Sequence, residues 1–112
     1  MLVVDQLYDQ ILEGMLDFID GDDDADYTSS DVEICGSLLS KFISSVPEGI
    51  SHDKAMVEVK TLVLALNELN EQCDFSLIET DQREGICELV FQTLAAAGVE
   101  FDEDVTEDWR EW

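Results

Sequence analysis

The sequence predicts an all-α fold, a compact bundle of about four main helices with a short acidic C-terminal segment. Apolar residues recur every three or four positions over four long stretches, which is the helical period. A single proline in 112 residues leaves these stretches almost uninterrupted, and alternating strand patterns are nearly absent. We expect one domain over residues 1–112, and the pattern leaves open whether its helices form a bundle or a compact orthogonal fold.

The first two helices are separated by an acidic loop. The first is expected over residues 3–20, with Gly14 as a mild flaw inside it. Its inward residues are Val4, Leu7, Tyr8, Ile11, Met15, Phe18 and Ile19. The second is expected to open with a capping box from Ser30 to Glu33 and to stop before Pro47. Its inward residues are Ile34, Cys35, Leu38, Leu39, Phe42 and Ile43.

The third helix has the clearest apolar stripe and is capped by Ser51. The stripe consists of Ala55, Met56, Val59, Leu62, Val63, Leu66, Leu69 and Cys73. The fourth helix is expected to begin at Thr80 or Asp81 and to end at Gly98. It carries inward Ile86, Leu89, Val90 and Leu94. In the acidic tail, residues 104–107 can cap a short helix that places Val105, Trp109 and Trp112 on one face.

Charge is the unusual feature of this composition. The chain has 28 acidic and 5 basic residues, a net charge of −23, and acids predominate along its whole length. Hydrophobic residues still make up 46% of the chain, which is enough for a folded core. Such a field repels nucleic acid and anionic membranes, so neither is expected as a partner. Solubility or adaptation to high salt is the simpler alternative, although solubility needs a net charge of only about 2–8.

The compartment is expected to be the cytoplasm. The first residues lack the basic start of a signal peptide and reach an acid at Asp5. The apolar stretches are too short to span a bilayer. The three cysteines (Cys35, Cys73 and Cys87) have no metal-like spacing and are expected to be reduced.

Catalytic machinery is not apparent in the sequence. His52 is the only histidine, so a zinc site or a nucleophile–histidine–acid triad is nearly excluded. A surface position for His52 is more typical than a role as a catalytic base. No glycine-rich phosphate loop is present, and acid pairs are unavoidable among 28 acids. We therefore expect no enzyme activity, no cofactor and no metal.

The acidic loop shares part of its pattern with a calcium-binding loop. Counted from Asp20, acids occupy loop positions 1, 3, 5, 7 and 12 between two helices. However, Ala25 occupies the sixth position, where the turn requires glycine, and Asp31 replaces the bidentate glutamate. A solvated acidic loop is the simpler interpretation, and imitation of phosphate spacing is the preferred functional one.

A resemblance enters at residues 66–87, which read LNELNEQCDFSLIETDQREGIC. This stretch, within residues 60–90, and the acidic helical chain as a whole resemble small immunity proteins of bacterial contact-dependent growth inhibition and related polymorphic toxin systems. The resemblance implies a cytoplasmic inhibitor that binds one cognate toxin domain, often a nuclease. It carries over no particular binding residue.

The charge and the resemblance lead to one expected mechanism. A nuclease presents a cationic cleft to its substrate, so an acidic inhibitor is steered to that cleft and occludes it. The expected steering residues are Asp20, Asp22, Asp23, Asp24 and Asp26, and the expected anchors are Tyr27, Trp109 and Trp112. For the tryptophans, docking on the bundle itself is an equal alternative. The rival functions are a DNA-mimic inhibitor of a host or phage-defence DNA-binding protein, and an antitoxin or acidic chaperone for a basic partner.

Overall fold

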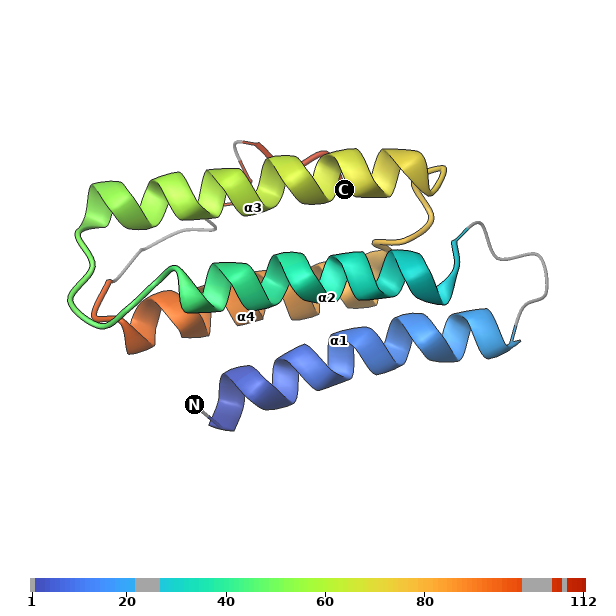
Figure 1. Cartoon of the computed structure of the whole chain (residues 1–112), viewed down its shortest axis with the longest axis horizontal. Helices are drawn as coiled ribbons and strands as arrows, with labels where there is room; N and C mark the ends of the chain where they lie inside the picture. Colours follow the sequence, from blue (N-terminus) through green and yellow to red (C-terminus); the bar gives the residue numbers. More distant parts are fainter. Residues whose placement is uncertain (1, 22–26, 100–105, 108) are drawn as a thin grey trace.

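Four helices lie side by side, and each runs antiparallel to the one before it in the chain, as in an up-and-down bundle (Figure 1). They are α1 (Leu2–Gly21), α2 (Ser29–Ser44), α3 (His52–Gln72) and α4 (Thr80–Ala96). The computed structural model describes residues 2–21, 27–99, 106, 107 and 109–112, and the side chains of all these except residues 2, 3, 20 and 21. No strand occurs within these ranges, so the predicted all-α bundle is confirmed.

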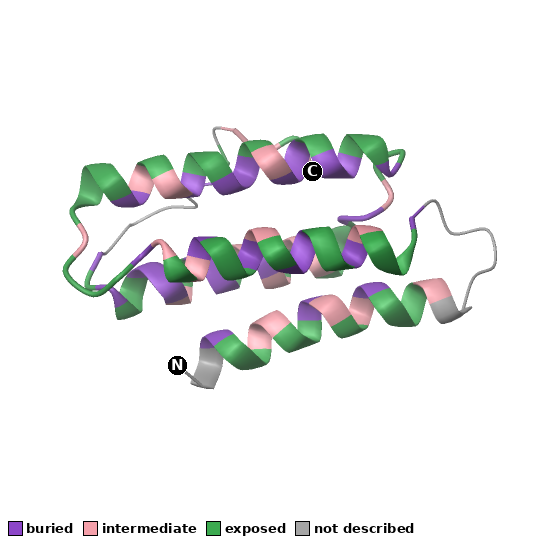
Figure 2. Cartoon of the chain, viewed as in Figure 1, coloured by how far each residue is buried: buried purple, intermediate pink, exposed green. Residues whose placement is uncertain are grey.

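The helices surround one hydrophobic core, with buried residues on their inward faces (Figure 2). The inward positions predicted for α4 are all buried, and so is the α3 stripe apart from the half-buried Met56. For two residues the prediction of a core position is wrong. Ile34 is 49% exposed because Cys35 and Leu39 define the buried stripe of α2, and Phe18 is 37% exposed beside Tyr27.

The start of α2 also corrects the sequence prediction. The helix is capped by Thr28 and not by Ser30, because the Thr28 backbone N–H donates to the Asp31 carboxylate at 2.9 Å. Asp31 therefore takes the role expected of Glu33, and α2 begins earlier than predicted.

The Ser51 cap of α3, the start of α4 and its stop at Gly98 are confirmed, whereas α1 is one residue longer at each end than predicted. Ser51 Oγ accepts the Lys54 backbone N–H at 3.2 Å and caps α3. α4 begins at Thr80 and is terminated by Gly98, whose φ of 89° is left-handed. The Gly98 N–H donates to Ala95 O at 3.1 Å and the Val99 N–H to Leu94 O at 2.9 Å, which satisfies the last carbonyls.

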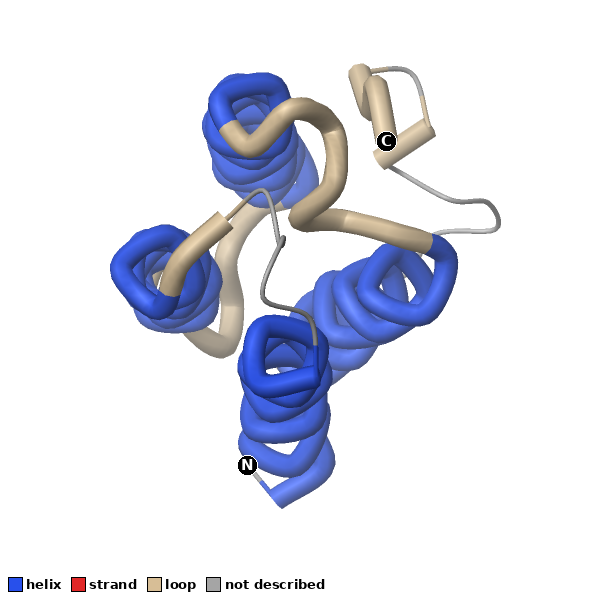
Figure 3. The backbone as a smooth tube through the Cα atoms, turned by 90° about the vertical axis from the view of Figure 1, so that its right-hand side faces the viewer, coloured by secondary structure: helices blue, strands red, loops and turns tan. Residues whose placement is uncertain are grey.

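Packing around the bundle is uneven. The extensive helix contacts are α1 with α4, α2 with α3, and α1 with α2, so α3 and α4 make the least direct contact among neighbours. The C-terminal segment lies beside this fourth side (Figure 3). It bonds to both helices, through Asn67 of α3 and Cys87 of α4. The tail therefore completes the bundle where two helices do not meet closely.

Within the described ranges, no helix combines the length and apolarity needed to cross a bilayer.

Candidate partner-binding surface

A row of acids runs along the outer face of α1. Asp5, Asp9, Glu13 and Asp17 are spaced four residues apart and all are exposed. At a rise of about 1.5 Å per residue, successive carboxylates are about 6 Å apart along the helix axis. The helix carries no lysine or arginine, and each like-charged pair four residues apart costs about 0.2–0.5 kcal/mol. α1 thus carries a row of four exposed acids, with no lysine or arginine on the same helix.

The steering residues predicted in the acidic loop cannot be placed against this row. The side chain of Asp20, and the whole of Asp22, Asp23, Asp24 and Asp26, lie outside the described residues. Their steering role stays a prediction. The calcium pattern of this loop also lies mostly outside the described residues. In the part of the chain that the structure describes, no group of three His, Cys, Asp or Glu residues could hold a metal ion.

Tyr27 is a core residue, which corrects its assignment as an exposed anchor. Its side chain is only 3% exposed, and its hydroxyl donates to the Met15 carbonyl at 3.2 Å. Burial, with a smaller contribution from the Glu79 carboxylate, raises the pKa of Tyr27 to about 12, so the hydroxyl keeps its proton. Its ring stacks on Phe18 with centroids 5.7 Å apart. Tyr27 therefore fastens the end of the α1–α2 loop to α1 and offers a partner almost no surface.

Trp109 and Trp112 are half-buried and pack on the core. The expected short helix is not present at residues 106, 107 and 109–112; a single turn forms instead, in which the Arg110 N–H donates to Thr106 O at 2.9 Å. Val105 lies outside the described residues. Only the outer parts of the two indoles remain available, so docking on the bundle accounts for most of their apolar surface.

The docked tail is fixed by one buried amide of α3. Asn67 Nδ2 donates to the Trp109 carbonyl at 2.7 Å, and its Oδ1 accepts the Glu111 N–H at 3.0 Å. From α4, Cys87 Sγ lies 3.1 Å from Arg110 Nη1 and 3.6 Å from Thr106 Oγ1. These contacts tie both sides of the tail to the bundle.

A second buried amide, Asn70, organises the loop between α3 and α4. Its side-chain Oδ1 accepts the Ile78 N–H at 2.9 Å, and its main-chain carbonyl oxygen accepts the Phe75 N–H at 2.8 Å. Neither asparagine was predicted from the sequence to have a role. The available signal was their position, since Asn67 and Asn70 interrupt the apolar face of α3 between Leu66 and Cys73 and are three residues apart.

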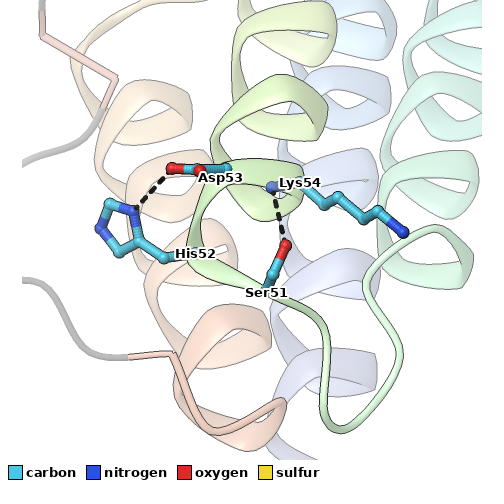
Figure 4. Close-up of polar contacts among 4 residues, drawn as sticks. All are labelled: Ser51, His52, Asp53 and Lys54. Carbon is cyan, nitrogen blue, oxygen red and sulfur yellow. Dashed lines mark hydrogen bonds and ion pairs between the residues drawn. The ribbon is translucent and has the colours of Figure 1, made fainter.

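His52 occupies the first turn of α3 as predicted, on the surface (Figure 4). Its side chain is 62% exposed, and Nδ1 lies 4.0 Å from the carboxylate of the fully exposed Asp53. Its neighbours in the first turn are the Ser51 cap and Lys54.

The thiols differ in their surroundings. Cys35 and Cys73 are buried and Cys87 is half-buried, and none of the three forms a disulfide. Burial raises the pKa of Cys35 to about 12 and that of Cys73 to about 11, so neither is a nucleophile at neutral pH.

Searches of protein-family models, of curated proteins and of solved structures find no match to this chain.

Proposed function

We propose that this protein is an immunity protein, which binds and neutralises a cognate cationic toxin domain, most suitably a nuclease. The observation that carries the proposal is the net charge of −23 on a well-packed helical scaffold, with the acid row of α1 as its best-defined part. The inhibitor acts by binding and not by catalysis.

The energetic argument concerns charge that folding does not need. The four acids of the α1 row repel one another, and the helix itself carries no lysine or arginine. A cationic cleft that holds a polyanion would relieve this repulsion on binding. The same field accelerates association, towards about 10⁸–10⁹ M⁻¹s⁻¹ at low salt. Fast capture suits an inhibitor that must intercept a toxin before it acts.

A DNA-mimic inhibitor of a DNA-binding defence or host protein is the second candidate. The spacing of about 6 Å along α1 supports it equally, because regularly spaced carboxylates can occupy phosphate positions on any DNA-binding surface. The two candidates differ in the partner. An immunity protein protects a cell that expresses the toxin encoded next to it, whereas a DNA mimic releases DNA from its binding protein.

The test is neutralisation of the neighbouring toxin domain, in cells and with purified proteins. Co-expression should restore growth, and equimolar inhibitor should abolish the toxin's nuclease activity. A cationic toxin domain that remains fully active in the presence of excess inhibitor would exclude the proposal. Release of DNA from a DNA-binding protein, without toxin neutralisation, would favour the second candidate.

Location of the steering charge is tested with variants of equal net charge. The first converts the α1 row to amides: Asp5→Asn, Asp9→Asn, Glu13→Gln and Asp17→Asn. A matched control removes four exposed acids elsewhere: Glu33→Gln, Glu48→Gln, Glu68→Gln and Glu71→Gln. A third variant tests the loop: Asp22→Asn, Asp23→Asn, Asp24→Asn and Asp26→Asn. We expect the first or third to slow association about tenfold and the control to slow it less, because local charge dominates steering.

A further inference from the structure

A groove of about 830 Å³ lies between α1 and the beginning of α4. One wall is the face of α1 from Leu7 to Phe18, and the other is the α3–α4 loop with the first turns of α4. Trp112, the last residue of the tail, also lines it. The groove therefore depends on three segments that are distant in sequence.

Two exposed aromatic rings lie at the edge of the groove. Phe75 is 60% exposed and Phe18 is 37% exposed. Phe75 also has a φ of 61°, a left-handed conformation that is unfavourable for a bulky residue. The chain thus holds a phenyl ring in solvent at a strained position, where Asn or Gly would fit better. Exposure and strain together make Phe75 a candidate contact residue for a partner.

The charged residues that line the groove are mostly acidic and favour a cationic occupant. Asp17, Glu79 and Asp81 are exposed at the groove, against the single base Arg83. Asp17 is also the last acid of the α1 row, so the row leads to the groove. A second copy of this chain, also at −23, would be repelled, and so would an anionic ligand. A cationic and partly apolar segment complements both the acids and the phenyl rings.

The indole of Trp112 places a buried hydrogen-bond donor beside the groove. The Nε1–H of Trp112 is buried and has no hydrogen-bond acceptor among the described residues. Buried indole N–H groups normally have an acceptor. The Trp112 side chain therefore brings an unsatisfied donor close to the groove, under the surface that its lining residues form.

We propose that this groove is the docking site for a basic segment of the protein partner. An arginine or lysine side chain is held among Asp17, Glu79 and Asp81, and a neighbouring apolar or aromatic side chain packs on Phe18 and Phe75. The inference rests on the proposed function and adds the place where the toxin domain is held. Steering along α1 and anchoring in the groove are then separate steps of one encounter.

The probe is an amidated, fluorescein-labelled hexapeptide of alternating arginine and tryptophan, bound to the full chain. Peptides that alternate arginine with serine, or glutamate with tryptophan, separate charge from apolar contact. We expect tight binding only for the first, with amide shifts in NMR spectra concentrated at the groove. Equal binding of the arginine–serine peptide, or shifts spread over α2 and α3, would overturn the proposal.

The decisive variant is Phe75→Asn, because asparagine tolerates the left-handed conformation and the fold should be retained. Its control is Phe91→Gln, which removes a 49% exposed ring of α4 outside the groove. We expect Phe75→Asn to weaken peptide binding about tenfold, and Phe91→Gln to leave it nearly unchanged. Unchanged affinity for Phe75→Asn would contradict the inference. So would a dimer of the free protein that Phe75→Asn abolishes, since the occupant would then be a second copy.

Failure of the inference is distinguishable from failure of the proposed function. If the wild-type protein and Phe75→Asn neutralise the toxin with equal affinity, the groove is not the anchor and the immunity function stands. If the wild-type protein neutralises no cationic toxin domain, the immunity function fails, and the peptide measurements alone decide whether the groove binds basic segments.

Discussion

At the scale of single residues, Asn67 and Asn70 show how much of this molecule depends on two amides. Both lie on the buried face of α3, where a leucine would suit the core. Asn67 instead supplies both a donor and an acceptor to the tail, and Asn70 accepts a backbone N–H from the next loop. Buried polar groups are tolerated when their hydrogen bonds are made, and here these bonds determine where non-helical segments lie.

Asn67→Ala should release the tail while the helices stay folded. The change removes both hydrogen bonds and leaves two backbone groups of the tail without partners, which costs about 1–3 kcal/mol. The only two tryptophans of the chain are in this tail, so their fluorescence reports its docking directly. We expect a red shift of emission with little change in far-UV circular dichroism. Gln72→Ala, on the exposed side of the same helix, is the control and should shift nothing. Unshifted emission for Asn67→Ala would show that the indoles hold the tail without the amide.

At the scale of elements, the position of α1 is decided by small residues at its contacts. A Cβ on Gly85 of α4 would lie 2.9 Å from Ile11 Cγ1, closer than side chains normally approach. A Cβ on Gly36 of α2 would lie 3.0 Å from Leu12 Cδ1 and from the Tyr8 hydroxyl. These glycines let α1 approach both neighbours closely. Gly14, on α1 itself, is different, because its Cβ would meet Gln82 at an ordinary 3.5 Å.

Two alanine substitutions should therefore change stability in opposite directions. Gly14→Ala should raise the free energy of unfolding by up to about 1 kcal/mol, because alanine is the better helix former and the space is free. Gly85→Ala has the same propensity gain but must displace Ile11, so we expect a net loss of about 1–3 kcal/mol. Urea denaturation of both variants beside the wild type measures the difference. A stabilised Gly85→Ala variant would mean that α1 and α4 leave room for a methyl group between Gly85 and Ile11.

At the scale of the whole molecule, the balance is between a well-packed core and an acidic surface. The core draws on all four helices, and burial of its aliphatic and aromatic residues stabilises the fold. The net charge of −23 opposes it, since like charges on a domain with a radius of gyration of 13.7 Å act on one another at short range. Ionic strength should therefore change the stability of the free protein and its association in opposite directions.

Sodium chloride should raise the melting temperature of the free protein. The screening length falls from about 10 Å at 0.1 M to about 3 Å at 1 M, which weakens repulsion over most of the surface. The variant with four amides on α1 should show a smaller rise, because it has less repulsion to screen. Differential scanning calorimetry across this range is the measurement. A melting temperature that falls or stays constant would indicate that the surface acids do not strain the fold. The association rate with a cationic toxin domain should fall over the same salt range.

The sequence predicts the fold class, four helices with nearly correct bounds, the Ser51 cap and the Gly98 terminus. These features depend on periodicity and on local backbone chemistry, which neighbouring residues largely fix. It also determined the net charge, from which the proposed function follows. It misplaced the start of α2, because Thr28 with Asp31 and Ser30 with Glu33 have the same capping spacing, and only the folded chain chooses between them.

Tertiary structure alone decided which side chains reach solvent and which segments meet. Tyr27 looked like an exposed aromatic at the end of a polar loop, yet it is buried, because its ring stacks on Phe18 and its hydroxyl finds an acceptor in the Met15 carbonyl. Phe18 and Phe75, from opposite parts of the chain, line one groove only because α1 packs beside the start of α4. The tail lies on the bundle because α3 and α4 leave a side open and Asn67 faces it. Such contacts join residues tens of positions apart, where periodicity and spacing carry no information.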